Sequence, residues 1–236
     1  MKKEILIFGS SGALGNGVTK VFLQKKYNKI YLFDFKHKEL LNTNVEQIII
    51  SDLSEEENVK KAFNQVTPSK EKVFFLLSTI GGYAGGKKVW ETDSSYFDRM
   101  INMNLKTSFL IAKYFSLLVS ESHSGSICFT SAFTALVAEA GKAVYGSSKS
   151  ALIHLVKTLA EEGKEIRLSA NAIAPFIIDT PANREWMPAS TDLEKDSIFE
   201  SWIKPAEIGE FVNSVFESYN ILSGNIFQLR YRFNTY

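Results

Sequence analysis

The chain has 236 residues with 27 Lys and Arg against 26 Asp and Glu, which gives a formal net charge of +1. This balance provides no basic surface for nucleic acid or an anionic membrane, so we expect a small-molecule substrate as the partner, no nucleic acid and no membrane. One cysteine, Cys128, and three histidines allow no disulfide within the chain and show no metal-ligand spacing, which favours a cytoplasmic protein without a bound metal.

Short apolar runs alternate with longer amphipathic stretches, which is the pattern of repeated strand and helix units around a parallel sheet. The expected strands are Ile5–Phe8, Ile30–Phe33, Gln47–Ile50, Val73–Leu77, Ser126–Thr130, Arg167–Ile173 and Ile226–Leu229. The expected helices are Leu14–Lys26, Glu55–Gln65, Tyr96–Val119, Tyr145–Glu162 and Ala206–Ser218. With neither a repeat nor a linker to divide it, the sequence predicts one α/β domain over residues 1–236. Its fold class is a Rossmann-type, doubly wound, mainly parallel seven-stranded sheet with helices on both faces.

A glycine-rich segment, GSSGALG at residues 9–15, joins the first strand to the first helix. Glycines at such a junction permit a tight turn and let backbone amides approach a pyrophosphate at the helix N-terminus. The GxxGxxG spacing differs from the usual dinucleotide fingerprint and lacks the ending of a P-loop, so a plain turn is the alternative.

Two acidic residues follow the next strands. Asp34 ends the second strand about 20 residues after the loop, where a carboxylate can accept hydrogen bonds from the adenosine ribose. Its charge would repel a 2′-phosphate, although Lys36 and His37 could offset this, so NADH is favoured and NADPH is the alternative. Asp52 could accept from the adenine amino group, with Leu53 packing on the ring. The competing interpretations are an exposed strand-end acid and a turn residue, respectively.

Two stretches break the alternation of strands and helices. Residues 78–90 are rich in glycine, and residues 174–205 contain four prolines. Both follow the carboxyl end of an expected strand, where open α/β sheets bind ligands. We therefore expect a substrate loop or lid at about residues 174–205.

Tyr145 and Lys149 are four residues apart, which places the phenol and the ammonium on one face of the expected helix. A nearby cation favours the phenolate and brings this weak acid closer to the operating pH. Such a pair can pass a proton while a nucleotide cofactor passes a hydride. The alternative is a surface pair that arose by chance. The position of Tyr145 and Lys149 after the fifth strand argues against this alternative.

Taken together, these motifs resemble the short-chain dehydrogenase/reductase family over nearly the whole chain. The matching pieces are GSSGALG, Asp34, Asp52, Asn104 in MNLK, Tyr145 and Lys149 in YGSSK, and residues 171–175 with Thr180. The resemblance implies that Tyr145 is the general acid/base, that Lys149 binds the nicotinamide ribose and assists it, and that Asn104 holds a water in the proton relay. The cofactor contacts that we expect are Gly9, Ser11, Gly12, Ala13, Leu14, Gly15, Asp34, Asp52, Leu53, Thr79, Ile80, Gly81, Thr130, Tyr145, Lys149, Pro175, Ile178 and Thr180.

The chain departs from the family pattern at two places. The family's serine, thirteen residues before the tyrosine, is Ala132 here, and Ser131 should point to the other side of an extended chain. The family's Asn-Asn-Ala-Gly after the fourth strand reads STIG at residues 78–81. Both departures, with the GxxGxxG loop, are similar to a branch of the family that reduces quinonoid dihydropterins with NADH and lacks the serine.

The likeness to this branch extends to two loops that would face the substrate. Residues 81–86 form a glycine-rich loop with an aromatic residue, and residues 179–184 are followed by Met187 and Pro188. Asn104 is the departure from this branch. We expect NAD(P)H-dependent reduction of a quinonoid dihydropterin. The expected substrate contacts are Gly82, Tyr83, Ala132 and Asn183.

Two other functions remain as hypotheses. A carbonyl reductase or alcohol dehydrogenase fits the wider family, and a nucleotide-sensing protein without chemistry fits the fold. The two longest expected helices are apolar over more than one stripe, and the family resemblance implies a four-helix bundle between subunits, so we expect a homodimer, with a tetramer as the alternative.

Overall fold

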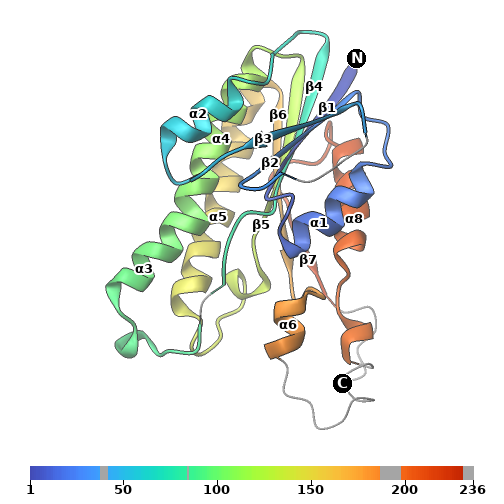
Figure 1. Ribbon diagram of the computed structural model, residues 1–236. Coiled ribbons are helices and arrows are strands. Elements are labelled where there is room, and N and C mark those ends of the chain that lie inside the picture. Colours follow the sequence, from blue (N-terminus) through green and yellow to red (C-terminus); the bar gives the residue numbers. More distant parts are fainter. Residues whose placement is uncertain (38–41, 84, 187–197, 231–236) are drawn as a thin grey trace.

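The fold is built on one central sheet in a computed structural model that describes residues 1–37, 42–83, 85–186 and 198–230 (Figure 1). The strands of the sheet are β1 (Lys2–Phe8), β2 (Lys29–Asp34), β3 (Val45–Ile49), β4 (Lys72–Ser78), β5 (Ser124–Thr130), β6 (Leu168–Pro175) and β7 (Ile226–Leu229). Their order is β3-β2-β1-β4-β5-β6-β7, and every neighbouring pair is parallel. The predicted strands and the doubly wound fold class are confirmed. The order reverses between β1 and β4, where such sheets open a crevice for ligands.

Helices cover both faces of the sheet. They are α1 (Ala13–Phe22), α2 (Glu56–Phe63), α3 (Ser94–Ile101), α4 (Thr107–Ser120), α5 (Ala143–Glu162), α6 (Pro181–Trp186) and α8 (Pro205–Glu217). Short turns of other helix types are η1 (Val89–Glu91), η2 (Asn102–Lys106), η3 (Phe133–Ala135) and η4 (Gly163–Ile166). Figure 1 shows α2, α4 and α5 on one face, with α1 and α8 on the other. Within the described ranges, no helix combines the length and apolar character that crossing a membrane requires.

Alternating side chains of the central strands pack into two hydrophobic cores, one on each face of the sheet. In β1, Leu6 and Phe8 pack into the cluster with α2, α4 and α5, whereas Ile5 and Ile7 pack into the cluster with α1 and α8. All four are fully buried. Burial on both faces explains why these strands appear in the sequence as continuous apolar runs.

The predicted helix Tyr96–Val119 is wrong as one continuous α-helix. The structure divides it into α3, the five-residue π-helical turn η2 and α4. The buried residue of this turn is Asn104, and hydrophobic periodicity did not reveal the interruption. Turns of this kind are frequent at functional sites, and η2 contains Asn104.

The expected irregular region at residues 174–205 contains regular structure. Pro181–Trp186 form helix α6, and Ile178 makes a parallel bridge to Ile203. Residues 187–197, with Met187 and Pro188, lie outside the described residues, so the expected lid is described only at its two ends.

Candidate active site

A cleft of about 730 Å³ opens at the carboxyl ends of β1, β2, β3 and β4. Among the residues predicted to contact a cofactor, those that line it are Gly9, Ser11, Gly12, Asp34, Asp52, Leu53, Thr79, Ile80 and Gly81. Segments that are far apart in the sequence are therefore brought to one cavity. Its volume is within the range usual for small-molecule sites.

Sequence reasoning missed part of the cleft wall. The additional lining residues are Phe35, Ile50, Ser51, Ser54, Ser95, Asp98, Arg99, Asn102, Met103 and Thr107. Several of them come from α3 and η2 at intervals of three and four residues, beginning at Ser95, and residues so spaced share one helical face. The sequence contains this spacing of polar residues, so it could have predicted that this helical face lines the cleft.

Close packing explains the glycines of the loop after β1. Gly9 has φ +81°, and a Cβ on Gly15 would lie 1.8 Å from the carbonyl oxygen of Gly9. Helix α1 therefore begins directly against the loop. Its N-cap, Gly12, provides no side-chain cap, so first-turn amides such as those of Ala13 and Leu14 are available to an anion.

Asp34, at the end of β2, is buried and bonded to this loop. Its carboxylate accepts hydrogen bonds from the amide and the hydroxyl of Ser11, the latter at 2.6 Å. The Ser10 hydroxyl donates to it at 3.2 Å, and the Phe35 amide at 2.8 Å. The side chain is only 6% exposed, so the structure contradicts the alternative of an exposed strand-end acid.

Asp52 has the geometry of a turn residue. The amide and the hydroxyl of Ser54 both donate to its Oδ1 at 2.8 Å, and these bonds hold the pKa of the carboxyl below its usual value. Asp52 and Leu53 nevertheless line the cleft, and Leu53 packs against the core. The turn holds these side chains at the mouth of the cavity.

Lys149 on α5 is a buried cation. It is 3% exposed, and its Nζ donates to the carbonyl oxygen of Thr130 at 2.8 Å. Burial lowers its pKa from 10.5 to about 8. No carboxylate of the described residues forms an ion pair with it. A buried charge of this kind is costly unless a polar partner joins it, and the ribose hydroxyls of a nucleotide would supply such partners.

Tyr145 lies one turn earlier on the same helix. Burial, with a smaller contribution from the neighbouring Tyr83, raises the pKa of its phenol to about 12. The expectation that Lys149 brings this pKa closer to the operating pH is therefore wrong for the protein without a nucleotide, because burial outweighs the cation. The two rings meet edge to face, with centroids 5.1 Å apart. The phenol is therefore protonated at neutral pH and able to donate.

Asn104 fixes the glycine-rich loop after β4. It is fully buried, and its Oδ1 accepts from the amide of Gly82 at 2.9 Å while its Nδ2 donates to the carbonyl oxygen of Gly82 at 3.1 Å. The Nδ2 also donates to Ser148 Oγ at 3.0 Å. The side chain thus clamps loop and helix together. Its main-chain carbonyl accepts from Ser108 Oγ at 2.8 Å.

Gly81 passes close to Lys149 on α5. A Cβ at this position would lie 2.7 Å from Lys149 Nζ and 2.8 Å from Asn104 Oδ1. The residue also has φ +151°, a conformation that favours glycine. Only glycine therefore lets the loop approach the buried lysine this closely.

The segment after β5 presents no hydroxyl at the position of the family's serine. Ala132 is buried and extended, with φ −155° and ψ 156°. Ser131 points elsewhere, as expected, because its hydroxyl donates to the main-chain carbonyl of Lys149 at 3.0 Å. Cys128 is fully buried, and burial raises the pKa of its thiol to about 12, so it is no nucleophile.

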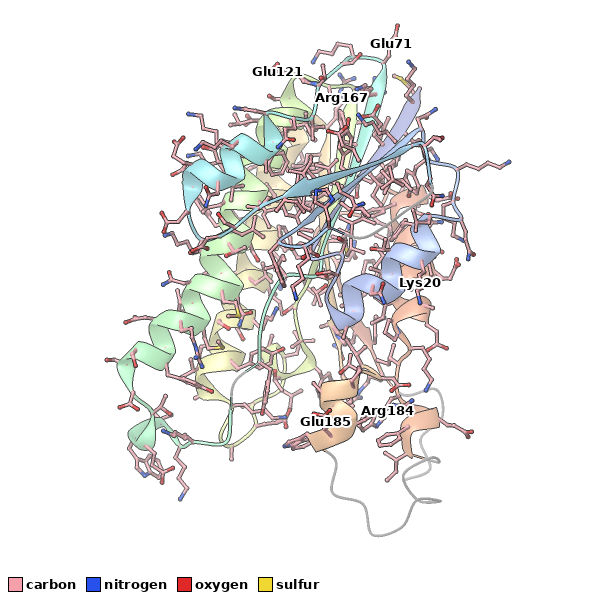
Figure 2. All side chains as sticks on the ribbon, in the orientation of Figure 1. Lys20, Glu71, Glu121, Arg167, Arg184 and Glu185 are labelled. Carbon is pink, nitrogen blue, oxygen red and sulfur yellow. The ribbon has the colours of Figure 1, made fainter. Side chains whose placement is uncertain are left out.

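Strand β6 ends at Pro175. The segment that follows it has its own network of hydrogen bonds among residues 178–184. Asn183 Nδ2 donates to the carbonyl oxygen of Ile178 at 2.8 Å, and the Asn183 amide donates to Thr180 Oγ1 at 3.3 Å. Asp179 accepts a bidentate pair from Arg184, which Figure 2 shows at the end of the molecule opposite Arg167.

Several predicted residues do not line the cleft of about 730 Å³. They are Ala13, Leu14, Gly15, Gly82, Tyr83, Asn104, Thr130, Ala132, Tyr145, Lys149, Pro175, Ile178, Thr180 and Asn183. The cavity therefore collects the residues expected at the adenosine, namely Asp34, Asp52 and Leu53, with part of the glycine-rich loop, whereas the expected catalytic residues lie outside its lining. Searching the described residues for three or more His, Cys, Asp or Glu able to hold a metal ion finds no such group.

Comparison with known proteins gives consistent similarities. The family model described as enoyl-(acyl carrier protein) reductase matches residues 14–219. Dihydropteridine reductase of Dictyostelium discoideum is 31% identical over 212 residues, which cover 89% of this chain and 86% of that protein. Carbonyl reductase family member 4 of Xenopus laevis is 24% identical over 228 residues, covering 92% of each. The structure of ElxO with NADP bound has a TM-score of 0.82 at 24% identity, covering 97% of both chains.

Proposed function

Because the chain belongs to the short-chain dehydrogenase/reductase family and is an oxidoreductase of that type, we propose that it reduces a quinonoid dihydropterin with NADH. The observation that carries the proposal is the contact of Tyr83 with Tyr145 at a site where residue 132 is alanine. An exposed flat ring lies beside a partly buried phenol, and a flat heterocycle can stack on such a ring.

The missing serine supports a pterin more than a ketone. A carbonyl oxygen that gains negative charge benefits from a second hydroxyl donor, and the loss of such a donor typically costs ~3 kcal/mol of transition-state stabilisation. A pterin spreads the developing charge over several ring nitrogens and depends less on that donor. Ala132 is then compatible with activity.

The residues present fit a dinucleotide. The first-turn amides of α1 would hold the pyrophosphate, Asp34 the adenosine ribose, and Lys149 the nicotinamide ribose. A bound NADH would supply the hydride. We favour NADH because the buried carboxylate of Asp34 repels a 2′-phosphate, and NADPH is the alternative, since ElxO is a fold neighbour with NADP bound.

Tyr145 would supply the proton that balances the hydride. Its raised pKa keeps the phenol protonated at neutral pH. The cation of Lys149 on the same helix face would stabilise the phenolate that forms when the proton leaves. Asn104 would hold the loop that carries Tyr83 in place during this step.

The second candidate function is reduction of a ketone or aldehyde. Asn104, which is ordinary for the wider family, favours it, as does the likeness to carbonyl reductase family member 4. The experiment is NADH oxidation by the purified protein with quinonoid dihydropterin and, separately, with a panel of ketones and aldehydes. We expect turnover with the pterin at a kcat/KM at least ~10-fold above that for any carbonyl. Turnover of carbonyls alone would contradict the proposal and establish the second function.

We also propose a homodimer formed through the outer faces of α4 and α5. Phe109 and Leu117 of α4 are 51% and 54% exposed in the single chain, and apolar side chains in such positions are commonly buried by a partner. Light scattering should give twice the chain mass, or four times for a tetramer. A monomer at all concentrations would contradict this assembly.

A further inference from the structure

The carboxylate of Asp34 has all its acceptor positions filled by the protein itself. Its Oδ1 accepts from Ser11 Oγ at 2.6 Å and from the Phe35 amide at 2.8 Å. Its Oδ2 accepts from the Ser11 amide and from Ser10 Oγ at 3.2 Å. A carboxylate offers about four lone-pair sites, so these donors saturate it. A ribose hydroxyl can bind Asp34 only by replacing one of them.

The four donors differ in how easily they can leave. Two are main-chain amides, whose positions are fixed by the loop and by the end of β2. Ser10 is 3% exposed and is held inside the protein. Ser11 is partly exposed and lines the cleft, and its hydroxyl can turn away by rotation about one bond. The hydroxyl of Ser11 is therefore the donor that a ribose would replace.

We infer that Ser11 determines how tightly the site binds the vicinal hydroxyls of an adenosine ribose, because its own hydroxyl occupies their place on Asp34. This rests on the proposed dinucleotide function. Each binding event exchanges one charge-assisted hydrogen bond for another, so the ribose gains less than it would from a vacant carboxylate oxygen. A ligand with a 2′-phosphate keeps only the 3′-hydroxyl and places a negative charge beside the carboxylate, so it gains less from a vacant acceptor position on Asp34.

The inference predicts a gain of affinity when the competing hydroxyl is removed. Ser11→Ala keeps the main-chain amide on Oδ2 and leaves one acceptor position on Oδ1 vacant toward the cleft. Its affinity for NADH should rise about threefold to tenfold, which is the range of a typical net hydrogen bond. Its affinity for NADPH should stay within about twofold of the wild type.

The matched control is Ser214→Ala. The hydroxyl of Ser214 donates to the main-chain carbonyl of Glu210 on the exposed side of α8 at 3.1 Å, and Ser214 does not line the cleft. The experiment is calorimetric titration of NADH and NADPH into both variants and the wild type, with thermal unfolding of each to verify folding. We expect Ser214→Ala to bind both nucleotides within about twofold of the wild type.

Wild-type binding separates the two claims. If the folded wild type binds neither NADH nor NADPH, the proposed function fails and the inference fails with it. If the wild type binds NADH but Ser11→Ala binds it equally or more weakly, only the inference is overturned. Equal gains in Ser11→Ala and Ser214→Ala would also overturn it, because the effect would then not depend on the bond to Asp34.

Discussion

The ring of Tyr83 meets the ring of Tyr145 edge to face, with centroids 5.1 Å apart and ring planes at 77°. Tyr83 belongs to the glycine-rich loop after β4, whereas Tyr145 belongs to α5. Asn104 clamps this loop at Gly82 and reaches α5 through Ser148. The loop is thus connected to α5 at two places, through the contact between the two rings and through Asn104.

Removal of the Tyr83 ring should weaken substrate binding. We expect Tyr83→Ala to raise the KM for the pterin about fivefold to tenfold, because an aromatic contact contributes roughly 1 kcal/mol. Tyr83→Phe keeps the ring and should stay within about twofold of the wild type. Steady-state kinetics with NADH binding as a control tests this, and an equal rise in KM in both variants would show that the ring is not the feature used.

The buried Lys149 should make the protein less stable at neutral pH than it is at high pH. Its pKa is about 8 when folded and 10.5 as the ordinary value. Below pH 8 the lysine is charged in both states, so the cost of burial is fully present. Between pH 8 and 10.5 the unfolded state binds more protons than the native state, so stability rises with pH.

The variant Lys149→Met removes this dependence. We expect a free energy of unfolding on the order of 1–3 kcal/mol above that of the wild type at pH 7, and a smaller difference at pH 10. Urea unfolding at both pH values measures it. A difference that is the same at pH 7 and pH 10 would contradict the lowered pKa.

The same pKa should appear in catalysis. We expect the wild-type kcat/KM for reduction to fall as pH rises through about 8, because a neutral Lys149 no longer stabilises the phenolate of Tyr145. Lys149→Arg keeps a cation at every accessible pH, so its lower activity should show no decline near pH 8. An identical inflection in both proteins would assign the titration to another group.

The seven strands could be predicted because strands of a parallel sheet are buried on both faces and appear as continuous apolar runs. Their ends were less certain, since polar residues such as Lys2 and Lys29, which break the apolar pattern, extend β1 and β2 through backbone pairing. Arg167 was expected to begin the sixth strand, but it adopts a left-handed conformation with φ 58°, and β6 begins at Leu168. Local composition does not reveal that conformation.

The site could be predicted only where its residues lie within one short sequence motif. The spacing of Tyr145 and Lys149 on a helix follows from sequence, and so does the loop before α1. The bonding of Ser11 to Asp34 joins residues 23 positions apart and depends on how the loop meets β2. The π-helical turn at Asn104 likewise depends on packing and not on residue type.

Gly81 should tolerate no side chain. We expect Gly81→Ala to reduce kcat by at least ~100-fold, because its Cβ would displace Lys149 Nζ and Asn104 Oδ1 by contact as well as straining the backbone. Gly86→Ala is the matched control, since Gly86 has φ +100° but nothing within 4 Å of an added Cβ. Comparable kcat values in the two variants would reduce the role of Gly81 to backbone strain.

Restoring a serine at Ala132 should change the preferred substrate. We expect Ala132→Ser to raise the kcat/KM for ketones at least ~10-fold and to leave the value for the pterin within about threefold. Parallel assays of both substrates with NADH measure the ratio. An unchanged ratio would show that the absence of the hydroxyl does not select the substrate.

The central claim is that Tyr145 donates the proton in a hydride-transfer reaction on a pterin. The most direct measurement is NADH oxidation with quinonoid dihydropterin by the wild type beside Tyr145→Phe, with NADH affinity measured for both. The account predicts equal NADH affinity and a fall in kcat of at least ~100-fold in the variant, the usual contribution of a positioned acid. Turnover by Tyr145→Phe at the wild-type rate would contradict it.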